Sequence, residues 1–160
     1  VVGSLLFAEY ASMPLGFVPY AIEIPAIDRW LNTLPKPFAI AEVPMPSDGD
    51  IGAYERHNTM AMLHATAHWQ RTLHGYSGIR PALHQRIFRE LTLFPDAVSL
   101  ASLREVGVTY VVVHQDQYPA ERRGEIDERY RRFANQLRLE HVAGEGRVYR
   151  ILPDPGLPFP

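Results

Sequence analysis

Six polar side chains suited to proton transfer or to binding hydroxyl groups follow three apolar segments of the chain. They are Glu42 after the first segment, His74, Tyr76 and Ser77 after the second, and His114 and Asp116 after the third. A carboxylate, imidazoles and hydroxyl groups at one rim can act as acid and base, or can bind the hydroxyl groups of a sugar. The alternative interpretation is that these residues only mark the solvated ends of strands.

The segment Gly75, Tyr76, Ser77, Gly78 predicts a tight turn next to this rim. Its two glycines permit positive φ, and consecutive backbone N–H groups in such a turn can bind an anion or a hydroxyl group. The segment does not match the phosphate-binding patterns GxxxxGK[ST] or GxGxxG. The pattern therefore favours a turn imposed by packing over a binding loop.

Histidines are frequent in the middle of the chain, and two of them have a spacing found in metal sites. His64 and His68 stand four residues apart in a predicted helix, as the two histidines of HExxH do. The acidic residue of that motif is replaced by Ala65. Although His57 and His74 are near in sequence, surface or half-buried histidines explain the pattern better, so we predict no metal site and no cofactor.

Other reactive centres have no support in the sequence. The chain contains no cysteine, which excludes disulfides, thiol catalysis and a cysteine-based zinc site. It contains no GxSxG motif, so hydrolase chemistry is unsupported. We therefore predict no catalytic residue for the chain by itself.

The charge pattern excludes nucleic acid as a partner. The formal net charge is −2, which creates no positive field around the molecule. Residues 121–139 are rich in arginine, but acidic residues are interleaved with them. This pattern is typical of a solvated, salt-bridged helix face; the alternative is contact with anionic lipid headgroups or with another protein surface.

The elements that must position the rim alternate between strands and helices. Buried strands are predicted at 38–43, 73–74 and 108–114, and a hairpin at 140–143 and 147–152. Helical spacing of apolar residues predicts helices at 26–34, 54–70, 82–93, 97–106 and 121–139. The fold class is therefore α/β: a three-layer, mainly parallel sheet with flanking helices and a C-terminal antiparallel hairpin. In such sheets ligands bind beyond the carboxyl ends of the strands, where the rim residues stand.

Length and composition indicate one domain. The 160 residues are 46% hydrophobic, enough for one ordinary core. Residues 1–25 are an apolar and Pro-rich lead-in, interpreted as the end of a membrane helix and a linker; a buried first strand or helix is the alternative. Residues 26–152 form the single α/β domain, and 153–160 a Pro-rich tail.

Several short sequence motifs occur along the chain in an order that is typical of one known family. They are a Pro-rich stretch at 9–25, a short helix with Trp30 and Leu31, the strand Ala39-Ile40-Ala41-Glu42-Val43-Pro44, a helix ending in His68-Trp69, the turn His74-Gly75-Tyr76-Ser77-Gly78 with Pro81, Phe94-Pro95-Asp96, and LREVGVTYVVVH at 103–114. Together they resemble the C-terminal extracytoplasmic domain of bacterial multi-pass membrane proteins of the GT-C glycosyltransferase-like type.

This resemblance implies a location on the periplasmic face of a bacterial inner membrane. It also implies a membrane-embedded body of the same protein that uses a polyprenyl-phosphate sugar. The catalytic carboxylates of such proteins lie on loops outside this chain. The implied role is thus a soluble accessory domain that binds an acceptor glycan or a lipid-linked sugar and is not catalytic alone.

Two further hypotheses stay open. The chain can be a small free-standing enzyme that uses Glu42, His74 and His114 for acid–base chemistry, which requires the three side chains to meet. It can also be a purely structural interaction domain without a small-molecule ligand.

Overall fold

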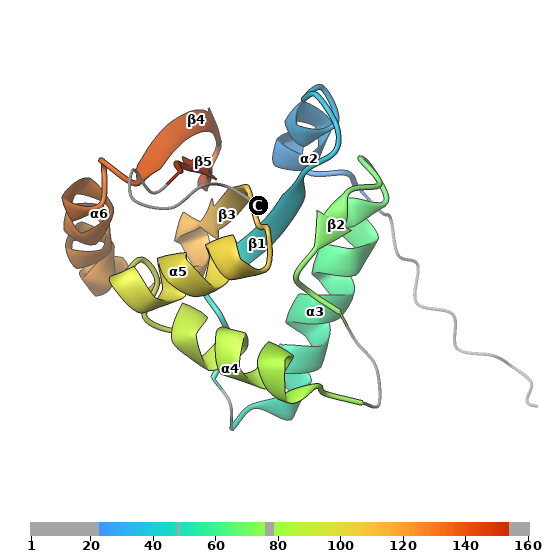
Figure 1. Cartoon of the computed structure of the whole chain (residues 1–160), viewed down its shortest axis with the longest axis horizontal. Coiled ribbons are helices and arrows are strands. Elements are labelled where there is room, and N and C mark those ends of the chain that lie inside the picture. The colour runs from blue at the N-terminus through green and yellow to red at the C-terminus, as the bar shows by residue number, and fades with distance from the viewer. Residues whose placement is uncertain (1–22, 48, 76–78, 154–160) are drawn as a thin grey trace, which may run out of the picture.

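The computed structural model describes residues 23–47, 49–75 and 79–153. The helices and strands of this part, in chain order, are α2 (Ala26–Leu31), β1 (Ala39–Val43), α3 (Ile51–Ala65), β2 (Arg71–Thr72), α4 (Ala82–Leu91), α5 (Ala97–Glu105), β3 (Tyr110–His114), the 3₁₀ turns η1 (Gln115–Gln117) and η2 (Ala120–Arg122), α6 (Arg123–Arg132), β4 (Leu137–Ala143) and β5 (Gly146–Ile151). Figure 1 shows the sheet with helices packed around it. The α/β class and the C-terminal hairpin are therefore confirmed.

The strands form one five-stranded sheet in the order β2-β1-β3-β5-β4. Strand β1 runs parallel to both β2 and β3, whereas β5 runs antiparallel to both β3 and β4. The sheet is mixed, and the prediction of a mainly parallel sheet is wrong. The uninterrupted apolar run of β3 indicates that the strand is buried, but it does not specify the direction of its neighbour, and the hairpin supplies that neighbour.

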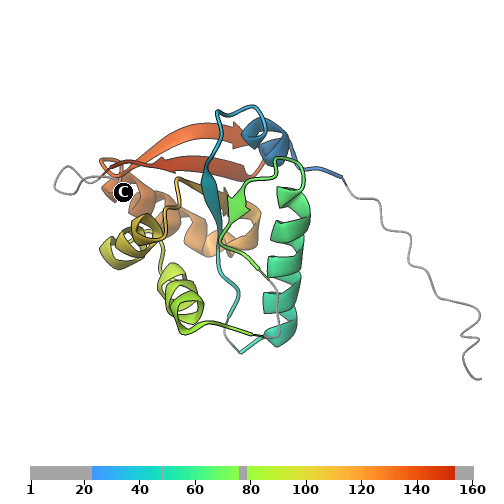
Figure 2. The same cartoon turned by 45° about the vertical axis from the view of Figure 1, so that its right-hand side comes forward.

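Apolar side chains cover both faces of the sheet because successive residues of a strand point to opposite sides. Ile40 and Val112 pack with Leu31 of α2 in one apolar cluster. Val43 and Val111 belong to a second, larger cluster that includes residues of α4, α5 and α6, among them Leu91, Leu103 and Ile126. Figure 2 shows α2 (blue) beside the strands of the hairpin at the upper right and α3 (green) running down the right-hand side. The three-layer arrangement stays a prediction.

The boundary between α6 and β4 differs from the prediction. Helical spacing predicts one helix from 121 to 139, but α6 ends at Arg132 and β4 begins at Leu137. Leu137 is 3% exposed and pairs with Ile151 across the sheet. Its position four residues after Phe133 fits a helix equally well, so the spacing alone does not distinguish the two structures.

The second strand is also displaced from its predicted position. β2 consists of Arg71 and Thr72, and only one further bond, from the Leu73 N–H to the Ile40 carbonyl, extends the pairing. The side chain of His74 is nevertheless buried at 2% exposure. The predicted strand therefore begins and ends about two residues too late.

The two ends of α5 agree with the prediction from the sequence. The Asp96 carboxylate accepts a hydrogen bond from the Ser99 N–H, and the Ser99 hydroxyl accepts one from the Asp96 N–H, which completes a capping box at the start of α5. Gly107 has φ 74° and follows the end of the same helix. Among the described residues, no helix combines the length and the apolar character that crossing a bilayer requires.

Candidate functional site

Two of the predicted rim residues meet at the carboxyl ends of β1 and β3. The Glu42 carboxylate lies 2.7 Å from Nε2 of His114, at hydrogen-bond distance. The parallel register pairs Glu42 with Val112, so His114 stands two residues further along β3 and on the same face. The side chain of Glu42 is 8% exposed and that of His114 is 24% exposed. The pair is therefore largely buried, with the imidazole nearer to solvent.

Each member of the pair stabilises the charged form of the other. Burial acts to raise the pKa of Glu42, but the hydrogen bond from His114 and the nearby imidazoles outweigh burial and lower this pKa to about 2. Burial acts to lower the pKa of His114, but the hydrogen bond and the charge of Glu42 outweigh it, so the pKa of His114 is raised.

His74, a third predicted rim residue, contacts the backbone of Glu42. The Glu42 N–H donates to Nε2 of His74 at 2.6 Å, where the carbonyl of a longer β2 would otherwise accept. Since Nε2 is an acceptor, the imidazole is neutral, and burial lowers its pKa to about 3. His74 thus holds Glu42 in position and is not among the side chains that line the pocket described below.

His57 of α3 completes the group, although it was not predicted as a site residue. Its ring contacts that of His74 edge to face, with 4.8 Å between ring centroids. Burial lowers the pKa of His57. Within the described part of the chain, its buried Nε2 has no hydrogen-bond partner. His57 is therefore a neutral imidazole with an unused polar atom beside the Glu42–His114 pair.

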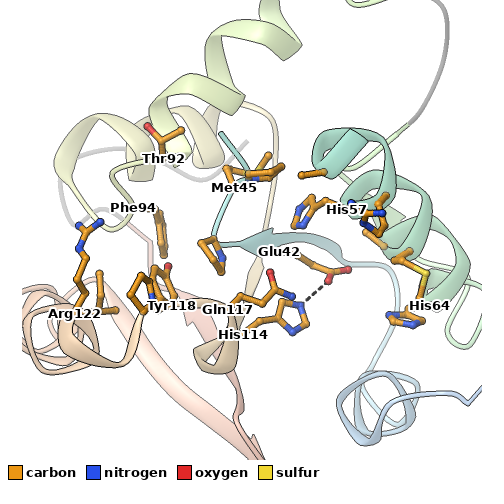
Figure 3. A pocket seen from close by; sticks show the side chains of 18 of the residues that line it. Glu42, Met45, His57, His64, Thr92, Phe94, His114, Gln117, Tyr118 and Arg122 are labelled. Atoms are coloured by element: carbon orange, nitrogen blue, oxygen red, sulfur yellow. Dashed lines mark hydrogen bonds and ion pairs between the residues drawn. The ribbon is translucent and has the colours of Figure 1, made fainter. Parts of the chain in front are cut away.

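Glu42, His57 and His114 border a pocket of about 570 Å³ between α3, the end of β1, and the segments before α5 and around α6. Figure 3 shows Glu42 and His114 joined by a hydrogen bond at the wall of this pocket, with His57 and His64 from α3 beside them and Phe94, Tyr118 and Arg122 further along. Among the described residues that line it, Glu42 is the only acidic one, whereas Arg56, Arg122 and Arg129 are cationic. The pocket therefore favours a ligand that combines hydroxyl groups with negative charge.

The arginines on the α6 side are held by partners outside the pocket. Arg129 donates to the Leu93 carbonyl at 3.0 Å and to the Glu125 carboxylate at 2.9 Å. Arg122 lies 3.7 Å from the same carboxylate. The predicted salt-bridged helix face is present, and two of its arginines also face the pocket.

Of the remaining predicted site residues, Asp116 lies in the described part of the chain, whereas two others do not. Asp116 is exposed in η1, where its charge acts on His114, but it does not line the pocket. Tyr76 and Ser77 lie outside the described residues. The role of the six rim residues as a binding site stays a prediction.

The histidine pair with the metal-site spacing does not share a helix face. Because α3 ends at Ala65, His64 lies on the helix and lines the pocket, whereas His68 follows it in a turn. Nε2 of His68 lies 3.6 Å from the buried Asp28 carboxylate. No group of three or more side chains in the described part is arranged to hold a metal ion.

Sequence reasoning missed the side chains that other elements bring to the pocket. These are mainly Met45, His57, Met60, Phe94, Tyr118 and Arg129. Tyr118 and Met45 follow the ends of β3 and β1 closely, so a search of the residues just beyond each strand end would have found them. His57 and Arg129 depend on where α3 and α6 pack, and no local pattern indicates that.

Comparison of the chain with protein-family models, with curated proteins and with solved structures finds no match.

Proposed function

We propose that the chain is an extracytoplasmic accessory domain of a glycosyltransferase-like integral membrane protein, at the periplasmic face of a bacterial inner membrane. In this proposal a three-layer α/β domain binds the acceptor glycan or the lipid-linked sugar, and the membrane-embedded part of the same protein carries out the transfer. The family assignment rests on the order of sequence marks. The binding role rests on one observation, the Glu42–His114 pair at the wall of the pocket.

The pocket offers the groups that a sugar or sugar phosphate requires. The ionised Glu42 carboxylate accepts hydrogen bonds from hydroxyl groups, and a charge-assisted bond of this kind is among the stronger polar contacts. The rings of Phe94 and Tyr118 provide apolar surface. Arg122 and Arg129 provide positive charge at the α6 side for a phosphate group.

The first experiment titrates the chain with a panel of sugars and with short-chain polyprenyl phosphates. Glu42→Gln is expected to weaken binding by about 10- to 100-fold, because the amide loses a charge-assisted hydrogen bond. Glu105→Gln is the matched control, since Glu105 is exposed on α5 and pairs with Arg86. It is expected to leave binding unchanged.

Two outcomes of this titration would contradict the binding role. If no member of the panel binds, or if both glutamine variants bind as the unchanged chain does, the pocket is not a sugar site. Thermal unfolding of each variant is measured alongside, so that a lost fold is recognised as such.

A free-standing acid–base enzyme is the second candidate, favoured by the 2.7 Å contact between Glu42 and His114. In that case the protonated His114 donates a proton and Glu42 keeps it charged and oriented. Incubation of the chain with each ligand that binds distinguishes the two candidates. Product formed by the unchanged chain and lost in His114→Gln supports an enzyme, whereas binding without product supports the accessory role.

A further inference from the structure

The turn between α3 and β2 presents a tryptophan to solvent. Trp69 is 80% exposed, and it is a non-glycine residue with φ 56°. A left-handed conformation is unfavourable for an ordinary residue because its Cβ lies too close to the backbone. Trp69 therefore combines a solvent-exposed aromatic side chain with an unfavourable backbone conformation, which contacts elsewhere in the fold must stabilise.

The base of this turn is rigid. The Trp69 N–H donates to the Ala65 carbonyl at 2.8 Å, and the Gln70 N–H donates to Nδ1 of His68 at 3.1 Å. His68 itself is fully buried, with its ring 5.8 Å from that of Phe38. The contacts of the neighbouring residues His68 and Gln70 thus fix the backbone of Trp69, and its side chain remains exposed.

Two basic residues flank the tryptophan. The Lys36 ammonium donates to the His68 carbonyl and to the Asn32 side chain, both at 2.9 Å, and Arg71 is exposed two residues after Trp69. Neither Lys36 nor Arg71 forms an ion pair with another described residue. Within the described part of the chain, both positive charges close to Trp69 in sequence or through the His68 carbonyl are thus without an acidic partner.

An exposed isoleucine lies in the segment that passes this turn. Ile24 is 42% exposed and precedes α2. Figures 1 and 2 both show the chain entering α2 beside the turn between α3 and β2. We define Ile24, Lys36, Trp69 and Arg71 as the Trp69 corner.

We propose that the Trp69 corner docks on an anionic lipid surface. Tryptophan has an apolar ring and an N–H donor, which suits the boundary between headgroups and acyl chains. Each basic residue near an anionic bilayer contributes to attraction. A second copy of the chain fits less well, because one tryptophan and one isoleucine are far smaller than a stable protein interface and the basic residues of two copies would repel.

The Trp69 corner and the Glu42–His114 pair lie at opposite ends of the parallel strands. Arg71 pairs with Ala39 at the start of β1, whereas Glu42 stands near its end. Three residues of β1 separate Ala39, the partner of Arg71, from Glu42, which corresponds to roughly 10 Å along the strand. Lipid binding and ligand binding can therefore be tested and can fail separately.

Tryptophan fluorescence reports on this corner alone once the other tryptophan is replaced. The sequence contains two, Trp30 and Trp69, and Trp30→Phe keeps an aromatic ring against His141. Adding vesicles of phosphatidylglycerol and phosphatidylcholine to this variant is expected to shift the Trp69 emission to the blue. Brominated lipids in the same vesicles are expected to quench it.

Charge variants test the lipid specificity. Lys36→Gln and Arg71→Gln are each expected to lower partition onto the anionic vesicles about fivefold, and to change partition onto pure phosphatidylcholine little. Arg86→Gln is the control, because Arg86 is exposed on α4 and pairs with Glu105. Glu42→Gln is expected to leave the fluorescence shift intact.

Three results would overturn the proposal. The first is no binding to either vesicle. The second is binding of the chain without a shift of Trp69 emission, which places the lipid contact elsewhere. The third is a shift that depends on protein concentration in the absence of vesicles, which identifies a second copy as the occupant.

Discussion

At the scale of single residues, the arrangement around Glu42 separates two roles of histidine. The hydrogen bond and the charge of Glu42 raise the pKa of His114, whereas His74 is neutral and accepts from the backbone N–H of the same glutamate. The two pKa values differ in direction because the His114 side chain borders the pocket and bonds the carboxylate, whereas His74 is buried at 2% exposure. One glutamate is thereby fixed in both position and charge.

The buried His74 predicts how stability depends on pH. Its pKa in the folded chain is about 3, below the ordinary value of 6.5, so the unfolded chain takes up this proton first as the pH falls. The stability contributed by a neutral His74 is thus complete above pH 6.5 and is lost progressively toward pH 3. In His74→Gln, where the amide oxygen can still accept from Glu42, the slope is expected to fall by about 1.4 kcal/mol per pH unit.

Urea unfolding from pH 7.5 to 4 measures this slope. Glu42→Gln serves as a comparison, because the pKa of Glu42 is lowered from 4.5 to about 2 and its own loss of stability begins below pH 4.5. A His74→Gln variant that keeps the full slope between pH 6.5 and 4.5 would show that His74 is not the buried neutral group described above.

At the scale of elements, helix ends depend on backbone conformation. Gly107 follows α5 with φ 74°, and its N–H donates to the Arg104 carbonyl at 3.0 Å. Gly124 lies within α6 instead. At both positions an added Cβ would meet nothing within 4 Å, so crowding does not distinguish them.

This pair of glycines gives opposite expectations for the same substitution. Gly107→Ala is expected to lower the free energy of unfolding by about 1 kcal/mol, because alanine is strained at positive φ. Gly124→Ala is expected to raise it by up to about 1 kcal/mol, because alanine favours the helix. Chemical denaturation of both variants measures the two changes, and changes of the same sign would contradict the assigned conformations.

At the scale of the whole molecule, the sheet joins two apolar clusters into one folding unit. Leu31 and Leu103 are both fully buried, the first in the cluster around α2 and the second in the cluster around α5. β1 contributes Ile40 to one cluster and Val43 to the other. Loss of either cluster removes the packing from one face of the same strand.

We therefore expect Leu31→Ala and Leu103→Ala each to lower the free energy of unfolding by about 2–5 kcal/mol. Both variants are expected to keep a single unfolding transition by fluorescence and by circular dichroism. Val98→Ala is the control, since Val98 is 59% exposed on α5, and a change within about 0.5 kcal/mol is expected. A second transition in the Leu31 variant would show that α2 unfolds separately from the rest.

The sequence alone determined those elements that are specified by a few neighbouring residues. The apolar run of β3, the capping residue Asp96 and the stop at Gly107 are each contained within a few neighbouring residues, and the structure has them where they were predicted. The expected meeting of Glu42 and His114 also follows from sequence, because both stand at the ends of buried strands.

Tertiary structure alone decided the rest. The direction of β5 beside β3, the end of α6 before Leu137, and the presence of His57 and Arg129 at the pocket all depend on how separate segments pack. Spacing in a sequence reports which side chains share a face of one element, but the free energy that chooses a neighbouring element comes from contacts between residues far apart in the chain. For this reason the sequence placed a glutamate and a histidine together, and the fold decided which pocket they border.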